Sequence, residues 1–314
     1  MRTSFTPGKI WQDSEGVSIQ AHGGCVLYYE GLYYWFGENK NGTTKPGSVV
    51  GSSVDAIGVS CYSSTDLYNW VNMGLVLPAV SDSPEHDLHT SKIIERPKVI
   101  YNDLTGKFVM FVHVDTPDYR YARLGTATSE KVTGPYKYLG SIIPHNSDSR
   151  DMTVIKDDDG KVFLFHSSEW NATMYAGELS SDYCHTTNTF TKNFEQGYRE
   201  APVVFKRCGK YYLLSSGCTG WDPNPAQVAI AENILGPWKV RGKPCAGPDS
   251  DKTFFAQITF VFSVVGKADA YIAMFDRWNK RDLGASRYIW LPIRFTGETL
   301  RIEWMDEWEL TCFG

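Results

Sequence analysis

The sequence predicts an all-β fold, a five-bladed β-propeller with its active site at one mouth of the central channel. Two observations predict this fold. First, one short layout recurs five times: a polar residue, a few apolar residues, a glycine turn and an aromatic-rich return strand. The five polar residues are His22, Glu95, Asp151, Glu200 and Gln257. Second, no amphipathic helix of about ten or more residues separates the repeats, which argues against folds that alternate strands and helices.

The return strand of each repeat is rich in aromatic and β-branched residues and is apolar on both faces. The five return strands cover residues 32–36, 107–112, 161–165, 210–214 and 270–275. A third, more polar strand is expected at residues 57–62, 124–128, 174–179 and 227–231. Strands buried on both faces need a sheet on either side, and units that cannot bury their faces alone stack radially into a propeller.

The first strand of each repeat is expected to line the channel, with its polar residue at the leading end. In four of the five repeats this residue lies nine positions before its glycine, so the five residues are expected to meet at one mouth. Neighbouring residues on a strand point to opposite sides. Arg150 and Arg199 therefore cannot share the channel with Asp151 and Glu200, and they are expected to brace neighbouring blades.

Length and composition predict one repeat-built domain, residues 1–314, because the repeats start roughly 50 to 75 residues apart. The net charge of −5 excludes a nucleic-acid surface, and no run of about 18 apolar residues predicts a membrane span. The chain start lacks the apolar core of a signal peptide. The expected location is the cytoplasm, or the periplasm or cell exterior if a leader was removed.

The seven cysteines lack disulfide or zinc spacing and are interpreted as small buried residues.

Three of the five polar residues are carboxylates: Glu95, Asp151 and Glu200. Gathering like charges at one rim lowers stability, so it needs a reason. Cleavage of a glycosidic bond supplies one, because it needs a protonated carboxyl for the leaving oxygen and a second group that handles water or the oxocarbenium-like sugar. A nearby anion raises the pKa of the acid. We therefore assign Glu200 as the general acid and Asp151 as the group that orients it and tunes its pKa. Structural pairing with neighbouring arginines is the alternative.

Several motifs, taken in order, resemble glycoside hydrolase family 43, and more narrowly its exo-β-1,3-galactanase branch and a neighbouring branch that acts on arabinogalactan side chains. The similarity covers nearly the whole chain. The motifs are Ala21-His22-Gly23-Gly24, Tyr34-Trp35-Phe36-Gly37-Glu38, Glu95-Arg96-Pro97-Lys98, Arg150-Asp151-Met152, Arg199-Glu200-Ala201-Pro202, Ser216-Gly217-Cys218-Thr219-Gly220-Trp221 and Thr253-Phe254-Phe255-Ala256-Gln257. The resemblance implies a five-bladed propeller and an inverting reaction.

The resemblance also implies roles for individual residues. In the wider family an aspartate base, an aspartate modulator and a glutamate acid stand on the first, third and fourth inner strands, and Asp151 and Glu200 match the last two. His22 stands where the aspartate base would be, and galactanase-like members share this departure. In them a glutamine that matches Gln257 is proposed to hold the attacking water. Because a neutral amide is a very weak base, Glu95 is kept as the alternative base.

Sugar contacts form a second group of expected site residues: His22, Glu38, Tyr119, Glu169, Thr219 and Trp221. Trp221 is chosen because apolar sugar faces pack on indole rings and its loop is rich in glycine, serine and threonine. The resemblance adds Glu38, Tyr119 and Thr219 as hydroxyl-binding residues. Glu169 is interpreted either as a further contact or as a turn residue.

No metal ligands are assigned. His113 and His166 close equivalent return strands and are interpreted as hydrogen-bonded strand ends. Asp157-Asp158-Asp159-Gly160 lacks the later ligands of a calcium loop and predicts a hairpin turn. No cofactor is required, although the resemblance allows a structural Ca²⁺ or Na⁺ in the channel.

The expected function is an exo-acting, inverting glycoside hydrolase that removes terminal sugars from plant arabinogalactan, with β-1,3-linked galactose as the favoured substrate. The alternatives on the same scaffold are an α-L-arabinofuranosidase, a β-xylosidase and a β-galactofuranosidase. The missing aspartate base leaves one further alternative, a carbohydrate-binding propeller without catalysis. The expected partner is an oligo- or polysaccharide, with no nucleic acid and no membrane.

Overall fold

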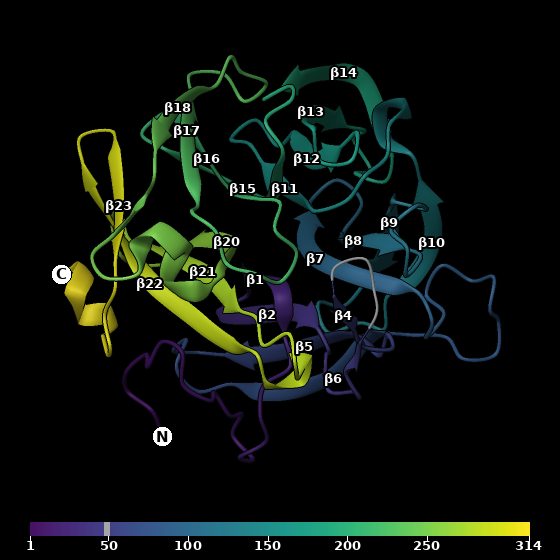
Figure 1. Ribbon diagram of the computed structural model, residues 1–314, viewed down its shortest axis with the longest axis horizontal. Helices are drawn as coiled ribbons and strands as arrows, with labels where there is room; N and C mark the ends of the chain where they lie inside the picture. Colours follow the sequence, from purple (N-terminus) through teal and green to yellow (C-terminus); the bar gives the residue numbers. More distant parts are fainter. Residues whose placement is uncertain (47–50) are drawn as a thin grey trace.

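The computed structural model describes residues 1–46 and 51–314. In this part of the chain, five sheets of four or five strands are arranged around one axis (Figure 1). The colours of Figure 1 run once around the ring, so each sheet uses one stretch of the sequence. The predicted five-bladed β-propeller is therefore confirmed.

Each blade is an antiparallel meander whose first strand is innermost. The first blade contains β1 (His22–Tyr29), β2 (Leu32–Glu38), β5 (Gly58–Ser64) and β6 (Val71–Pro78). The second contains β7 (Ile93–Asn102), β8 (Lys107–Asp115), β9 (Arg123–Ser129) and β10 (Lys137–Ile142). The third contains β11 (Met152–Lys156), β12 (Val162–Ser168), β13 (Thr173–Leu179) and β14 (Thr186–Asn193). The fourth contains β15 (Arg199–Arg207), β16 (Lys210–Gly217), β17 (Gln227–Ala231) and β18 (Lys239–Gly242).

The fifth blade contains β20 (Gln257–Ser263), β21 (Tyr271–Arg277), β22 (Arg287–Thr296) and β23 (Thr299–Glu303), with β19 (Cys245–Ala246) parallel to β23. A small separate two-stranded sheet pairs β3 (Lys45–Pro46) with β4 (Ser52–Ser53). The part of the chain that the structure describes also forms four short 3₁₀ helices: η1 (Pro144–Asn146), η2 (Ser250–Phe255), η3 (Leu283–Ala285) and η4 (Leu310–Phe313). Among the described residues, no helix has the length and apolar character needed to cross a bilayer.

The inner strands form a closed ring. β1 contacts β7, β7 contacts β11, β11 contacts β15, β15 contacts β20, and β20 returns to β1. The predicted return strands are β2, β8, β12, β16 and β21, and most of their residues are buried. Their apolar side chains fill the space between blades, which is why both faces had to be apolar.

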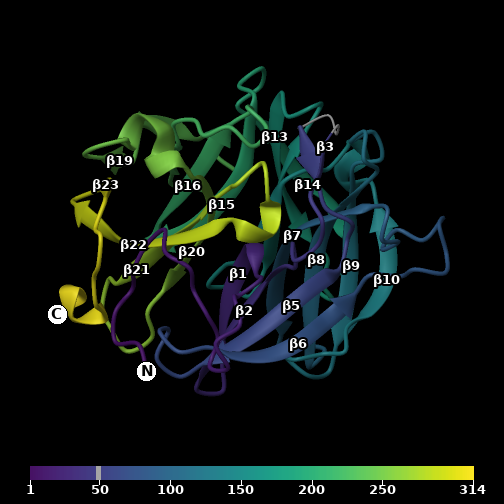
Figure 2. The same ribbon diagram turned by 60° about the horizontal axis from the view of Figure 1, so that its bottom comes forward.

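The start of the chain and the fifth blade close the ring against the first blade. Phe5 forms an isolated bridge with Trp308, and their ring centroids lie 4.3 Å apart. Trp35 of β2 and Trp290 of β22 are fully buried, with centroids 4.7 Å apart. Large buried aromatic rings of this kind dominate core energetics. Figure 2 shows both chain ends on the same side of the molecule.

Candidate active site

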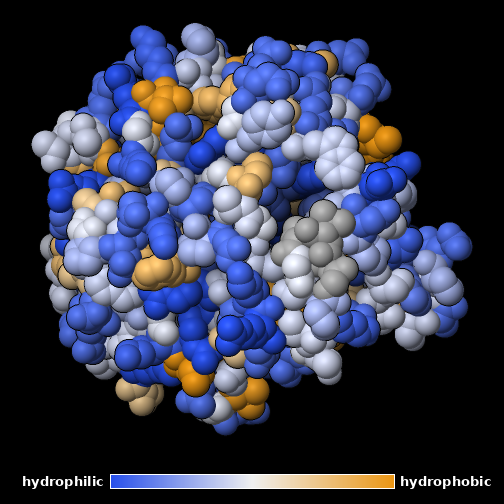
Figure 3. All heavy atoms as spheres, in the orientation of Figure 1, coloured by the Kyte–Doolittle hydropathy of each residue, from blue (hydrophilic) through white to orange (hydrophobic). Residues whose placement is uncertain are grey.

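A pocket lies at the mouth of the channel, and Figure 3 shows a hollow near the middle of this face. The lining residues are Glu95, Arg96, Tyr119, Asp151, Glu200, Gly220, Trp221 and Gln257. Four of the five polar residues that start the repeats thus meet in one pocket, and only His22 is missing from it.

Glu95 and Arg96 both line the pocket although they are neighbours in β7. The register of β7 against β8 shifts between Glu95 and Lys98, which marks a β-bulge. Arg96 has a φ of 56°, a left-handed conformation that residues other than glycine adopt rarely. The bulge interrupts the alternation of side chains, so a cation joins a carboxylate on the same side of the strand.

β1 and β15 also contain a β-bulge, because their registers shift just after the polar residue. In the three strands the next residue has a positive φ: Gly23 (60°), Arg96 (56°) and Ala201 (51°). A carboxylate of the preceding blade accepts the N–H of each: Asp276 Oδ2 at 2.9 Å, Glu38 Oε1 at 3.0 Å and Asp151 Oδ2 at 2.9 Å, respectively. These bonds satisfy amides that the shifted ladder leaves without a partner. We call the three features capped bulges.

Glu200 is partly buried in the pocket wall. Gln257 Nε2 donates to Glu200 Oε1 at 3.0 Å, and Asn171 Nδ2 donates to Glu200 Oε2 at 3.2 Å. Burial and the nearby charge of Asp151 raise the pKa of Glu200 to about 8. Glu200 therefore carries a proton at neutral pH, which is the state that a general acid needs.

Asp151 acts on two neighbours through one oxygen. Its Oδ2 accepts the N–H of Ala201 at 2.9 Å and lies 3.0 Å from Arg96 Nη2. The first contact fixes the bulge that follows Glu200, and the second ties the third blade to the second. The same anion thus orients Glu200 through the backbone and raises the pKa of its carboxyl group.

The side-chain amide of Gln257 has a defined orientation. Arg96 Nη2 and Trp278 Nε1 donate to Gln257 Oε1 at 2.6 and 3.0 Å. Both of these groups are donors only, so the oxygen must face them. Nε2 donates to Glu200 Oε1 and Ser216 Oγ, each at 3.0 Å. All four hydrogen-bonding positions of the amide are occupied, and in this arrangement no acceptor remains for a water molecule.

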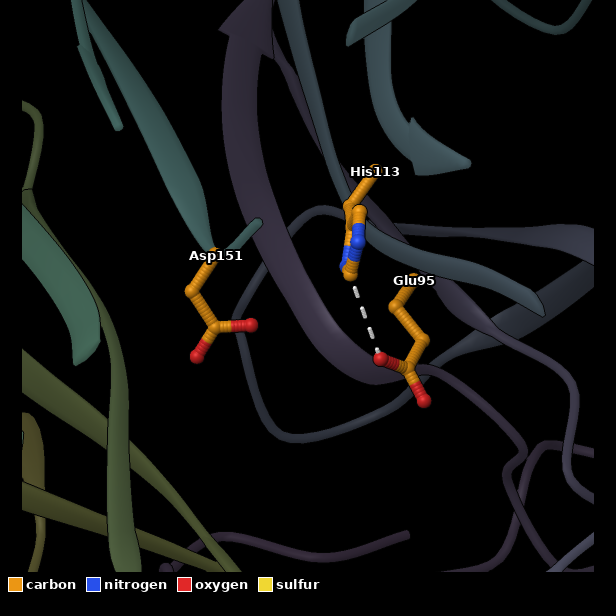
Figure 4. Close-up of side chains that lie close together, drawn as sticks. All are labelled: Glu95, His113 and Asp151. Atoms are coloured by element: carbon orange, nitrogen blue, oxygen red, sulfur yellow. Dashed lines mark ion pairs between the residues drawn. The ribbon is translucent and has the colours of Figure 1, made fainter. Parts of the chain in front are cut away.

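Glu95 lies across the pocket from Asp151, and Figure 4 shows the two carboxyl groups reaching toward the same space. Lys40 Nζ and Tyr119 Oη each lie 3.3 Å from Glu95 Oε1, and His113 Nδ1 lies 3.7 Å from Oε2. Although burial opposes ionisation, Lys40 and His113 lower the pKa of Glu95 to about 2. Glu95 is therefore a carboxylate at any pH where the protein would work.

Glu95, His113 and Asp151 bring candidate metal-binding atoms within 4.8 Å of one another. The surrounding charges do not suit a metal ion. Lys40 Nζ lies 3.3 Å from Glu95, and Arg96 Nη2 lies 3.0 Å from Asp151. Although burial opposes protonation, two neighbouring carboxylates raise the pKa of His113 to about 9, and a protonated imidazole has no lone pair for a metal. Lys40 and Arg96 thus pair with the two carboxylates of this group.

His22 and Glu38 do not line the pocket. His22 is fully buried, with Nδ1 2.9 Å from Asp276 Oδ1 and Nε2 3.3 Å from Tyr288 Oη. Neither ring nitrogen is left for a sugar hydroxyl. Glu38 is 3% exposed, caps the bulge of β7, and lies 2.7 Å from Lys40 Nζ. The structure gives both residues a supporting place around the bulges instead of a place in the lining.

Glu169 and Thr219 also lie outside the lining. The carboxylate of Glu169 accepts hydrogen bonds of 2.6, 2.7 and 2.9 Å from side chains of β13 and β14. Its φ of 53° fits the turn interpretation. Thr219 Oγ1 donates to the carbonyl oxygen of Asp222 and holds its own loop.

Trp221 crosses the mouth of the channel from the fourth blade. Its Nε1 donates to the carbonyl oxygen of Ser52 at 3.0 Å, and its ring lies 4.9 Å from that of Trp278. Lys40 Nζ lies 5.7 Å from the Trp221 ring centroid. Contacts with the first and fifth blades thus hold the indole as part of the pocket wall.

Arg150 and Arg199 stay out of the pocket lining, as side-chain alternation predicts. Arg150 Nη2 donates to the carbonyl oxygen of Tyr119 at 3.1 Å, so it braces the third blade against the second. The same prediction for Arg199 is wrong. Arg199 donates to Ser215 Oγ at 3.0 Å and to the Ser215 carbonyl oxygen at 2.6 Å, because these acceptors of the adjacent strand β16 lie within its reach.

Sequence reasoning missed four groups that touch the site: Lys40, Arg96, Asn171 and Trp278. Arg96 was considered only as a structural partner of the carboxylates, and a regular strand would point it away from the channel. A signal for the bulge was present, since Pro97 follows Arg96 and a proline inside a strand marks an edge or a bulge. No comparable local signal identifies the other three residues, which reach the site from loops or neighbouring strands.

A propeller that places a protonated carboxyl beside a second carboxylate and an aromatic wall has the features of a glycoside hydrolase. Residues 25–247 match the sequence model of the glycosyl hydrolases family 43. The chain therefore belongs to glycoside hydrolase family 43, as the motifs indicated.

Solved structures of this family are similar over nearly the whole chain. The GH43 β-1,3-galactosidase BT0265 is 41% identical with a TM-score of 0.93, covering 100% of this chain and 65% of that one. The exo-β-1,3-galactanase Pc1,3Gal43A of Phanerochaete chrysosporium, solved with galactose, is 33% identical with a TM-score of 0.89. The match covers 98% of this chain and 68% of that one.

Curated relatives match a smaller part of the chain. Xylosidase/arabinosidase 43B of Humicola insolens is 28% identical over 207 residues, which are 58% of this chain and 36% of the relative. A β-D-galactofuranosidase of Aspergillus niger is 24% identical over 189 residues, 56% of this chain and 54% of the relative. The matched region thus spans between about a third and a half of these longer proteins.

Proposed function

We propose that this protein is an exo-acting, inverting glycoside hydrolase that releases terminal β-1,3-linked galactose from arabinogalactan-type chains. The observation that carries the proposal is the pairing of Glu200 and Asp151. A carboxyl group with a pKa raised to about 8 lies beside an anion in a small pocket, and such a pair supplies the proton that a leaving sugar oxygen needs. The similarity to β-1,3-galactosidases and exo-β-1,3-galactanases supports galactose as the sugar.

Glu200 acts as the general acid in this proposal, and Asp151 holds it in place and keeps it protonated. Tyr119 and Trp221 form part of the wall against which the terminal sugar binds. The small volume of the pocket and its position at the channel mouth fit the removal of one sugar from a chain end.

Two groups compete for the attacking water. Gln257 needs a free acceptor for that role, so bound substrate would have to displace Arg96 or Trp278 from Oε1. Glu95 is ionised and needs no such change, although a pKa near 2 makes it a weak base. Azide distinguishes them, because it attacks without giving up a proton. The variant that lacks the base, Glu95→Gln or Gln257→Ala, is expected to regain turnover with azide and to form α-galactosyl azide.

Galactose release from β-1,3-galactobiose tests the proposed function. Nitrophenyl arabinofuranoside, xyloside and galactofuranoside are measured beside it, because relatives with these activities share the scaffold. We expect galactose from the disaccharide and little or no nitrophenol from the other substrates. Absence of galactose at high enzyme loading would contradict the proposal. Binding of the disaccharide without hydrolysis over days would instead identify a silent carbohydrate-binding propeller.

A further inference from the structure

A buried ammonium group lies between two of the capped bulges. Lys98 is 1% exposed. Its Nζ donates to the carbonyl oxygen of Gly23 at 2.8 Å and to those of Arg96 and Pro97 at 3.3 Å each. Gly23 belongs to the bulge of β1, whereas Arg96 and Pro97 belong to the bulge of β7. The three donors of one ammonium group thus match three backbone acceptors from two blades.

These carbonyl groups need a partner because a bulge takes backbone groups out of the regular ladder. The N–H groups of the same two bulges are bound by Asp276 and Glu38. Carboxylates therefore accept hydrogen bonds from the N–H groups of the bulges, and Lys98 donates hydrogen bonds to their carbonyl oxygens. Burial lowers the pKa of Lys98 to about 8, so the group stays an ammonium ion at neutral pH.

We propose that Lys98 is a positioning residue, a built-in cation that holds the bulges of β1 and β7 and thereby aims Glu95 and Arg96 into the pocket. Backbone carbonyl oxygens are also ligands that a hard metal ion prefers, and the Lys98 ammonium fills this role from within the chain. The inference rests on the proposed function only where galactose release is the readout.

The first test replaces Lys98 with Met, which has a similar length and no donors. We expect kcat/KM for β-1,3-galactobiose to fall roughly 100-fold, because a displacement of about 1 Å in a catalytic constellation has effects of this size. Lys156→Met is the matched control, since Lys156 pairs with Asp103 at the surface, and it is expected to keep wild-type activity. Wild-type kcat/KM in Lys98→Met would overturn the proposal.

The second test restores the cation from solution. Lys98→Ala leaves a space lined by the three carbonyl oxygens, and ethylammonium can place N–H donors there. We expect ethylammonium to raise kcat/KM of Lys98→Ala at least about tenfold, whereas tetramethylammonium, which has no N–H, does not. Choline chloride at equal ionic strength is the second control, because choline also lacks an N–H donor. A role in core packing alone would not respond to the donor, so equal rates with all three salts would contradict the proposal.

The third test uses the wild-type protein and remains informative if the variants do not fold. A buried ammonium group exchanges its protons slowly, so nitrogen-15 NMR is expected to show a protected lysine side-chain signal at neutral pH. Lys40, which is 8% exposed and pairs with Glu38 and Glu95, is the other buried lysine among the described residues. Lys40→Met assigns its signal. Absence of a second protected ammonium would overturn the proposal. If the wild type releases no galactose, the proposed function fails while this measurement still tests Lys98.

Discussion

The inner strands β7 and β11 are neighbours in the ring, yet they present their leading residues differently. β7 is bulged after Glu95, and both Glu95 and Arg96 line the pocket. β11 pairs with β12 without a register shift, and of Arg150 and Asp151 only Asp151 lines the pocket. A bulge thus lets one strand contribute two adjacent side chains, whereas a regular strand contributes one.

The regular strand also supports a bulged one. Asp151 caps the bulge of β15 through the N–H of Ala201 and lies 3.0 Å from Arg96. The residue that precedes the regular strand therefore fixes the backbone that carries Glu200 and holds the extra side chain of β7. The comparison suggests a division of labour in which bulged strands carry reacting groups and the regular strand keeps them in register.

The largest effect is expected at the bulged strand β15. Glu200→Gln keeps the shape of the side chain but removes the acidic proton, so kcat for β-1,3-galactobiose is expected to fall on the order of 1,000-fold. Glu169→Gln is the matched control, since Glu169 lies outside the pocket lining. Steady-state kinetics measures both variants, and equal activity of the two would break the assignment of the acid.

The next effect concerns the regular strand. Asp151→Asn can still accept the N–H of Ala201, but it removes the charge that helps to raise the pKa of Glu200. Wild-type kcat/KM is expected to fall as pH rises through about 8, because Glu200 loses its proton there. Without the anion the pKa of Glu200 is lower, so this limb moves to lower pH by about 1 to 3 units. An unchanged limb in the pH profile would show that Asp151 does not tune Glu200.

A smaller effect is expected outside both strands. Trp221→Ala removes an aromatic wall but no charged group, so KM for β-1,3-galactobiose is expected to rise up to roughly tenfold with little change in kcat. Trp170→Ala is the control, because Trp170 is 58% exposed and is not part of the pocket lining. A larger loss of kcat than of affinity would place Trp221 among the groups that position the acid.

The smallest effect tests the backbone contrast directly. At Arg96, with a φ of 56°, the Gly variant is expected to be more stable than the Ala variant by about 1 kcal/mol, because glycine adopts this conformation without strain. At Met152 in the regular strand the order reverses, and the Ala variant is expected to be more stable than the Gly variant by about 0.5 to 1 kcal/mol. Denaturant unfolding measures the four variants. The same order at both positions would contradict the bulge interpretation.

The sequence predicted the architecture because the five repeats carry it in plain form: polar start, glycine turn and apolar return strand. It also predicted that Glu95, Asp151, Glu200 and Gln257 would meet. It did not predict that His22 would lie outside the pocket lining, because its partner Asp276 lies far along the chain and is brought close only by ring closure.

The alternation rule failed at Arg96 for a local reason. Arg96-Pro97 and Ala201-Pro202 both follow a glutamate at the start of an inner strand, whereas Met152-Thr153 follows Asp151. Proline cannot donate to the ladder, so it marks the bulges of β7 and β15 and is absent from the regular strand, whereas the bulge of β1 contains Gly23 and Gly24 instead. The difference between the strands was therefore visible in the sequence, but its effect on side-chain direction required the observed register.

The central claim is that Glu200 donates the proton to the leaving sugar. The most direct test compares kcat of Glu200→Gln and of the wild type on two substrates. β-1,3-Galactobiose needs that proton, whereas the leaving group of dinitrophenyl β-galactoside departs without one. We predict that the variant loses on the order of 1,000-fold in kcat on galactobiose and stays within about tenfold of wild type on the dinitrophenyl substrate. Equal losses on both substrates would contradict the assignment of Glu200 as the general acid.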